Sequence, residues 1–185
     1  APQLPGAEPT TGEFGRWASQ IRQLRGDRVA IAKLVERLPP SERKLLPEVQ
    51  ATVEALLTRA GDLARTLTQM EGWVDEGAIA RLDERIRELE ARTTDPERDR
   101  RLDLMRRQRQ TLDELVGRRS EVEAQFESCV LAMQNVRFDL LRLRSAGVSA
   151  ALDDLTSATQ QARALSADVA AAISAAGEIK ELLGR

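Results

Sequence analysis

Apolar residues recur at alternating spacings of three and four positions along almost the whole chain of 185 residues. A repeat that averages 3.5 residues keeps one narrow stripe of an α-helix against a partner helix for turn after turn, as in coiled coils. Because no helix can bury such a stripe alone, the chain is expected to pack against itself, against copies of itself or against another protein. The longest stripe is the candidate interaction seam, which consists of Leu112, Leu115, Arg119, Val122, Phe126, Cys129, Met133, Val136, Leu140 and Leu143.

Three further stripes start at Phe14, Leu46 and Leu155, and a shorter one starts at Ile79. Together they predict an all-α fold, namely an elongated antiparallel helical bundle or coiled coil with one helix of about 50 residues, or about 75 Å. The helices are expected over about residues 13–38, 47–74, 78–92, 96–146 and 149–183. Residues 13–185 are expected to form a single helical bundle domain, and residues 1–12, rich in proline and glycine, a disordered linker.

Three interruptions of the pattern predict where helices end. Pro39-Pro40 stops the first helix, because proline removes a backbone donor and pushes the preceding residue out of the helical region. The stripe takes a step of five positions between Val74 and Ile79, which predicts a kink or a short skip rather than a full turn. Residues 93–97 (TTDPE) combine a threonine or aspartate N-cap with proline at the first helical position, so this short connection predicts antiparallel neighbours.

Composition excludes most catalytic chemistry. The chain lacks histidine, which removes the usual general base near neutral pH, Ser-His and Cys-His dyads and imidazole metal ligands. No glycine-rich loop that could cradle a phosphate is present. We therefore expect no catalytic, cofactor-binding or metal-binding residue, no cofactor and no small-molecule substrate. The 28 basic and 30 acidic side chains nearly balance, which gives no reason to expect nucleic acid as a partner.

Several residues within the stripes have two interpretations. The lone Cys129 is interpreted as a small buried hydrophobe rather than a reactive thiol, and a disulfide across the seam of a parallel dimer is the structural alternative. Arg28 and Arg119 either lay their stems along the seam edge or specify the register of pairing. Trp17 and Trp73 lie near helix ends or breaks. The preferred interpretation is that they anchor the packing of the helices, and the alternative is that they dominate the binding of a partner.

Arginine supplies nearly all of the positive charge. The dense cluster between Arg98 and Arg109 has acidic neighbours at helical spacing and no interleaved aromatic residue, which favours a solvated face over a phosphate-binding patch. Arg137, Arg142 and Arg144 are less well balanced locally and form the candidate acidic-partner patch, although pairing within the chain is the preferred interpretation.

No stretch approaches the roughly 18 consecutive apolar residues of a membrane span, so direct membrane insertion is not expected. The first residues lack the basic and apolar regions of a signal peptide. Because the chain begins Ala1-Pro2 without a methionine, we expect it to be a segment of a longer protein.

Three stretches resemble a known family: Phe14 to Arg28 (FGRWASQIRQLRGDR), Leu38 to Val49 (LPPSERKLLPEV), and Gln125 to Arg163, which contains NVRFDLLRLRSAGV and DDLTSATQQAR. Together they are similar to the C-terminal, non-catalytic helical region of bacterial serine/threonine protein kinases, and the resemblance covers nearly the whole chain. It implies a cytoplasmic regulatory tail, and it allows a tether to the inner membrane through a preceding segment. The kinase hallmarks, including the strand lysine and the catalytic-loop aspartate, are absent, so no kinase site residue carries over.

These observations predict a non-catalytic signalling segment that acts through association with itself or with another helical protein. The alternative is a passive monomeric helical spacer or scaffold segment.

Overall fold

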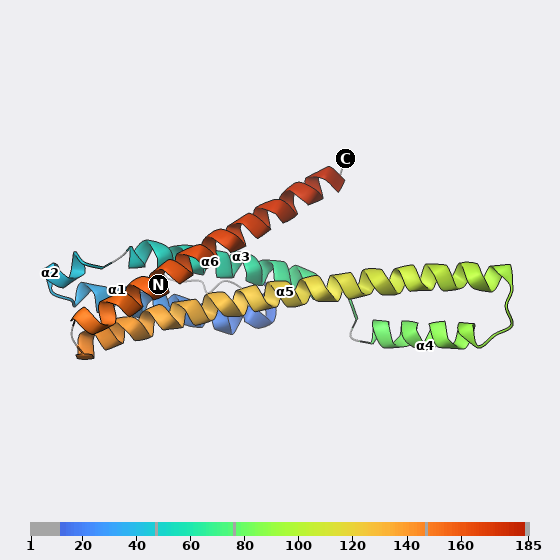
Figure 1. Ribbon diagram of the computed structural model, residues 1–185, viewed down its shortest axis with the longest axis horizontal. Helices are drawn as coiled ribbons and strands as arrows, with labels where there is room; N and C mark the ends of the chain where they lie inside the picture. Colours follow the sequence, from blue (N-terminus) through green and yellow to red (C-terminus); the bar gives the residue numbers. More distant parts are fainter. Residues whose placement is uncertain (1–11, 47, 76, 147, 184–185) are drawn as a thin grey trace, which may run out of the picture. The chain divides into compact units, whose positions relative to one another are not determined.

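The computed structural model describes residues 12–46, 48–75, 77–146 and 148–183, and their regular elements are all helices (Figure 1). The expected all-α class is confirmed, with no strand in these ranges. Residues 1–11, most of the expected linker, lie outside the described part of the chain. The elements are η1 (Gly15–Trp17), α1 (Ala18–Glu36), α2 (Pro40–Arg43), α3 (Val49–Met70), α4 (Ala78–Glu90), α5 (Pro96–Ala146) and α6 (Val148–Leu183). The long helix expected from Pro96 is α5, with 51 residues.

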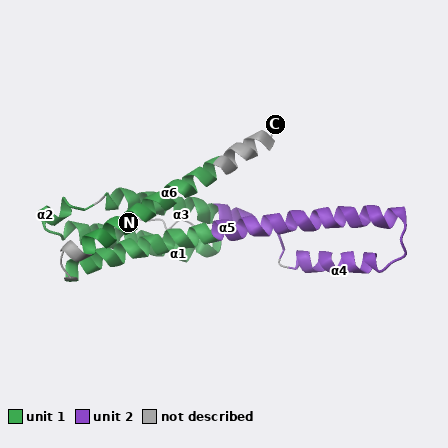
Figure 2. Cartoon of the chain, in the orientation of Figure 1, with its two compact units in different colours: residues 1–65, 124–185 green, residues 66–123 purple. Residues whose placement is uncertain are grey.

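The chain divides into two compact units (Figure 2). Unit 1 combines residues 1–65 with 124–185, and unit 2 is residues 66–123. The long helix α5 therefore contributes its C-terminal part to unit 1 and its N-terminal part to unit 2. The single domain expected over residues 13–185 stays a prediction.

In unit 1, helix α1, most of α3, the C-terminal part of α5 and the described part of α6 supply apolar stripes to one core (Figure 2). The fully buried side chains recur at the three- and four-residue spacing of the sequence, which is why each helix turns one face inward. Those with the largest side chains are Ile21, Leu24, Ile31, Val53, Leu56, Leu63, Phe126, Met133, Val136, Leu140 and Leu155. Small Ala60 and Ala162 are also fully buried, and alanine allows closer approach of helix axes than leucine does.

The entry to α1 is a short 3-10 turn around Gly15. Gly15 has φ of 46°, in the left-handed region where a side chain would be strained. This turn places Phe14 and Trp17 in the core, so Trp17 is the packing anchor that the sequence predicted. The guanidinium of Arg65 lies 5.7 Å from the centre of the Phe14 ring, within range of a cation–π contact.

The double proline ends α1 as expected. Helix α1 stops at Glu36, and Pro40 begins the single-turn α2. The guanidinium of Arg43 donates to the carbonyl oxygens of Glu36 at 2.6 Å and Leu38 at 3.1 Å. These bonds satisfy carbonyls that the end of a helix leaves without an intrahelical donor.

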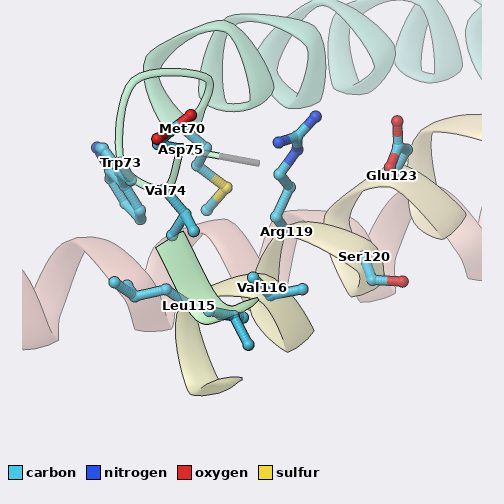
Figure 3. Close-up of a pocket in the computed structure, with 10 residues that line it drawn as sticks. Met70, Trp73, Val74, Asp75, Leu115, Val116, Arg119, Ser120 and Glu123 are labelled. Atoms are coloured by element: carbon cyan, nitrogen blue, oxygen red, sulfur yellow. The ribbon is translucent and has the colours of Figure 1, made fainter. Parts of the chain in front are cut away.

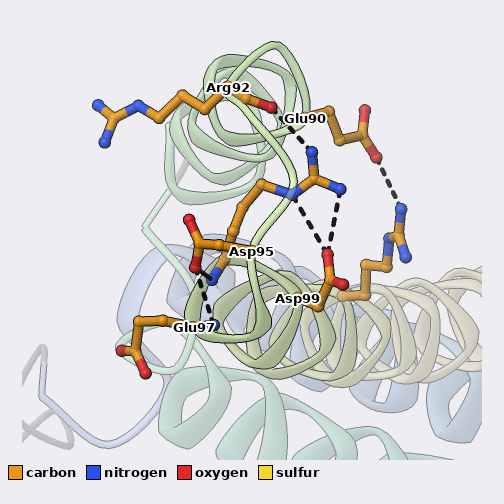
Figure 4. Close-up of polar contacts among 7 residues, drawn as sticks. Glu90, Arg92, Asp95, Glu97 and Asp99 are labelled. Carbon is orange, nitrogen blue, oxygen red and sulfur yellow. Dashed lines mark hydrogen bonds and ion pairs between the residues drawn. The ribbon is translucent and has the colours of Figure 1, made fainter.

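In unit 2, α4 and the N-terminal part of α5 form an antiparallel pair joined by residues 91–95 (Figure 4). The Asp95 carboxylate accepts the backbone N–H groups of Glu97 and Arg98, both at 2.9 Å, so aspartate is the N-cap of α5. Ion pairs join the two helices farther from the turn, from Arg106 to Glu90 at 2.8 Å and from Arg109 to Asp83 at 2.7 Å.

Candidate functional site

The candidate interaction seam on α5 has a covered part and an open part. Six members lie in unit 1, and each exposes at most 3% of its surface: Phe126, Cys129, Met133, Val136, Leu140 and Leu143. The four members in unit 2 are only partly buried: Leu112, Leu115, Arg119 and Val122. We call these four residues the open seam. The covered part is occupied by the fold itself, so the open seam is the part available to a partner.

The lone thiol belongs to the covered part. Cys129 is free and completely buried, and its burial raises the pKa of the thiol to about 11. At neutral pH the thiol is therefore protonated and a poor nucleophile. A disulfide between two copies would require this helix face to be uncovered first.

A cavity of about 340 Å³ adjoins the open seam within unit 2 (Figure 3). Trp73 stands at its edge with 50% of its surface exposed, and Val116 exposes 42%. In Figure 3, Met70 and Val74 lie between Trp73 and Arg119, and the α5 residues lie opposite the turn. The lining comprises Met70, Trp73, Val74, Asp75, Ile79, Leu115, Val116, Arg119, Ser120 and Glu123.

The cavity exists because helix α3 stops early. It ends at Met70, four residues before the expected end, and the Trp73 N–H bonds to the Met70 carbonyl in the turn that follows. Helix α4 starts only at Ala78, after a break that includes Gly72 and Gly77. The five-residue step between Val74 and Ile79 predicted a kink or a short skip rather than a full turn, and this prediction is wrong, because a turn after Met70 separates α3 from α4. Consequently, a turn rather than a helix face lies against this part of α5.

The rim of the cavity carries both signs of charge. Arg119 occupies a seam position and forms no ion pair with any residue that the structure describes. The carboxylates of Asp75 and Glu123 line the same cavity, and Asp75 pairs with Arg81. An apolar floor with a mixed rim suits a protein helix better than a phosphate-rich polymer.

The candidate acidic-partner patch is largely paired inside unit 1. Arg137 donates to Asp27 at 2.9 Å, and Arg142 lies 3.0 Å from Asp154 on α6. Asp139 lies 3.6 Å from Arg142. Burial raises the pKa of the Asp139 carboxyl group, and the positive charge of Arg142 offsets part of that rise. Arg144 is exposed. Because Arg137 and Arg142 already have carboxylate partners, the open seam is the stronger candidate for an interaction site.

The arginine cluster at the start of α5 also has carboxylate partners. Arg98, Arg101 and Arg106 pair with Asp99, Glu97 and Glu90 at 3.1, 3.0 and 2.8 Å. Arg109 pairs with both Asp83 and Asp113, which together raise its pKa. These pairs support the interpretation of the cluster as a solvated face.

Asp27 was missed by sequence reasoning. It lies on α1 with 4% of its surface exposed, and its carboxylate accepts from Arg137 through one oxygen while the other, Oδ2, is buried without a hydrogen-bond partner. The stripe from Leu24 allows either a three-residue step to Asp27 or a four-residue step to Arg28, and the four-residue step was predicted. Arg28 lies at the edge of the seam and pairs with Glu54 on α3 at 2.7 Å. The only signal for Asp27 was therefore its three-residue spacing from Leu24.

The described ranges hold no candidate for two other kinds of site. No cluster of three or more histidine, cysteine, aspartate or glutamate side chains is placed to hold a metal ion there. No described helix combines the length and the apolar character needed to cross a membrane. No family model matches the chain, and neither a curated protein nor a solved structure matches it.

Proposed function

We propose that this chain is a non-catalytic helical interaction module that associates with a second copy of itself through the open seam. One observation carries the proposal: α5 buries its stripe completely in unit 1 but leaves Leu112, Leu115, Arg119 and Val122 partly exposed in unit 2. In this proposal the seams of two copies pack as a coiled coil, with side chains of one helix inserted between those of the other. Another helical protein is the second possible occupant of the same surface.

The residues around the cavity have the character of an association site. Tryptophan is enriched among the residues that dominate binding energy, and Trp73 is half exposed beside the cavity. The mixed rim suits a twofold contact, because Arg119 of one copy could face the acidic rim of the other. The open seam covers only about 15 Å of helix, so we expect weak, reversible association.

The mechanism would be geometric. A weak contact between modules raises the effective concentration of whatever domains are joined to them. We further propose that the joined domain is a bacterial serine/threonine kinase, whose trans-phosphorylation would respond to assembly. Support for this part comes from residues 14–28, 38–49 and 125–163, which resemble the helical tails of such kinases. A kinase domain encoded immediately upstream would support it, and a different upstream domain would refute it.

Sedimentation velocity over a wide range of concentration tests the association. We expect the sedimentation coefficient to rise with concentration, and Val116→Asp and Trp73→Ser to remove most of that rise. Leu131→Asp is the matched control, because Leu131 lies on the same helix in unit 1 with 58% of its surface exposed. All three positions are at least 40% exposed, so the fold should tolerate these changes. A rise that only Leu131→Asp removes would contradict the proposal.

A passive monomeric spacer is the alternative function. The observation that favours it is the covered part of the seam, since unit 1 buries its stripes with helices of the same chain. The spacer hypothesis predicts a sedimentation coefficient that does not change with concentration, and no effect of Val116→Asp or Trp73→Ser.

A further inference from the structure

A second groove runs between α4 and α5 in unit 2, with a volume of about 420 Å³. Each helix presents to it a row of residues three, four and seven positions apart, which is the spacing of one helix face. Two such rows side by side form the type of groove into which a third helix packs. The lining residues are Arg85, Glu88, Leu89, Arg92, Arg101, Leu104, Met105 and Gln108.

Three of the residues that line this groove are apolar. Leu89 is buried, Met105 is partly exposed, and Leu104 exposes 66% of its surface. A single exposed leucine is ordinary on a protein surface. Here, however, Leu104 and Met105 adjoin a buried leucine in one hollow, which gives an incoming side chain a continuous apolar contact.

Cations without partners stand on the rim. Arg85 and Arg92 form no ion pair with any described residue, whereas Arg87 and Arg106 nearby pair with Glu84 and Glu90. Figure 4 shows the Arg92 guanidinium extending away from the ion pairs of the turn. A guanidinium group presents a rigid fork of donors that matches a carboxylate.

The other charges of the groove limit its occupants. Arg101 already pairs with Glu97 at 3.0 Å, and Glu88 is the one acidic residue in the lining. No aromatic residue lines the groove to stack a base, which disfavours a single-stranded nucleic acid. A second copy is also disfavoured, because a twofold contact would bring together two surfaces that each carry three arginines and one glutamate.

We propose that the α4–α5 groove binds an acidic amphipathic helix of another protein. Its apolar face would contact Leu104 and Met105, and two carboxylates seven residues apart would pair with Arg85 and Arg92. Seven residues correspond to about 10 Å along a helix, which matches the separation of two arginines seven positions apart. This inference uses none of the open-seam residues, so it stands independently of self-association.

Peptide binding to the full chain tests the inference. The probes are fluorescein-labelled helical peptides of about 20 residues, with leucines on one face and two glutamates seven positions apart beside them. Matched peptides replace both glutamates with glutamine or with lysine. We expect fluorescence anisotropy to give the glutamate peptides a Kd about tenfold lower than that of the glutamine peptides, with the difference shrinking as salt is added.

Variants of the chain place the binding in the groove. Arg85→Gln combined with Arg92→Gln should weaken binding of the glutamate peptides about tenfold and leave the glutamine peptides unaffected. Leu104→Ser should weaken both kinds of peptide. Arg87→Gln, which removes an exposed α4 arginine outside the groove lining, should change neither. Circular dichroism should give the same helix content for all variants, since every substituted side chain is on the surface.

Three results would overturn the inference. The first is equal affinity for the glutamate and glutamine peptides, and the second is an equal loss in Arg87→Gln and in the double variant. The third is binding of oligo(dT) or of vesicles rich in phosphatidylserine through Arg85 and Arg92 without binding of the glutamate peptides. Sedimentation of the same samples distinguishes a failure of this inference from a failure of self-association, because a loss of self-association would leave peptide binding intact.

Discussion

Units 1 and 2 use the same helix in different ways. In unit 1, the part of α5 from Phe126 to Leu143 lies among α1, α3 and α6 (Figure 2), and its stripe is buried. In the described part of unit 2, α5 lies beside α4, the last residues of α3 and the turn at Trp73, and its stripe is only partly buried. The spacing of apolar residues is the same in both parts. A heptad pattern therefore identifies the face that seeks a partner, but the number of neighbouring helices decides whether the chain itself supplies one.

The two units also differ in their charged residues. Unit 1 buries a carboxylate, Asp27, and reaches it with Arg137 from a helix 110 positions away in sequence. Unit 2 has ion pairs at the surface, such as that of Arg106 with Glu90, whose side chains expose 57% and 46% of their surface. Charge in unit 1 should therefore matter for folding, whereas charge in unit 2 is available for recognition.

The largest difference should appear when the stripe is truncated. Phe126→Ala should lower the free energy of unfolding by about 3–5 kcal/mol, because it leaves a cavity in a completely buried core. Leu115→Ala, at the open seam, should lower it by only about 1 kcal/mol. Urea denaturation of both variants measures these values. Equal losses would break the comparison, because they would mean that the open seam is as well covered as the buried one.

A pH titration sharpens the description of unit 1. Burial raises the pKa of Cys129 from about 9 to about 11, so the folded state holds the thiol proton more tightly than the unfolded state does. This preference contributes stability below pH 9, and the contribution is lost as pH rises toward 11. Relative to Cys129→Ala, the unmodified chain should lose about 2 kcal/mol of stability over that interval. Parallel stability curves for the two proteins would show that the thiol is not enclosed.

Breaking the buried ion pair of Asp27 and Arg137 should lower the free energy of unfolding by a similar amount. Arg137→Met removes the partner of Asp27 and leaves a buried carboxylate without its cation, which should cost about 2 kcal/mol. Adding Asp27→Asn should recover part of the loss, since a neutral amide is cheaper to bury than a carboxylate. The free energies of unfolding of the two single variants and the double variant measure this coupling. Strictly additive losses would argue against a direct interaction.

The smallest effect is expected in unit 2, at the cap of α5. Asp95→Ala removes the side chain that accepts two backbone N–H groups, which should cost about 1 kcal/mol of stability. Thr94→Ala is the control, because threonine was the other capping residue that the sequence allowed. A larger loss of stability in Thr94→Ala than in Asp95→Ala would show that Thr94, not Asp95, caps α5.

Local signals in the sequence were sufficient for most of the helices and for two of their ends, but not for the early end of α3 at Met70. The three- and four-residue spacing predicted an all-α chain, Pro39-Pro40 predicted the end of α1, and residues 93–97 predicted the turn before α5. These features depend on neighbouring residues, whose effects on the backbone are short in range.

The position of the candidate site depended on longer-range packing. The sequence placed Trp73 beside a break, but whether a tryptophan there is buried depends on which helices surround it in space. Asp27 and Arg137 illustrate the same limit, since no local pattern links residues so distant along the chain. The seam was predicted as one continuous stripe, and only the fold separates its covered part from its open part.

Distances between spin labels on two copies test the central claim most directly. In a Cys129→Ala background, one sample carries a label at Val116→Cys beside the open seam, and another carries it at Leu131→Cys in unit 1. Pulsed electron–electron double resonance at high protein concentration should give a short intermolecular distance between labels at position 116 and a much longer one between labels at position 131. The absence of any intermolecular distance at position 116, or a short distance only at position 131, would contradict the account.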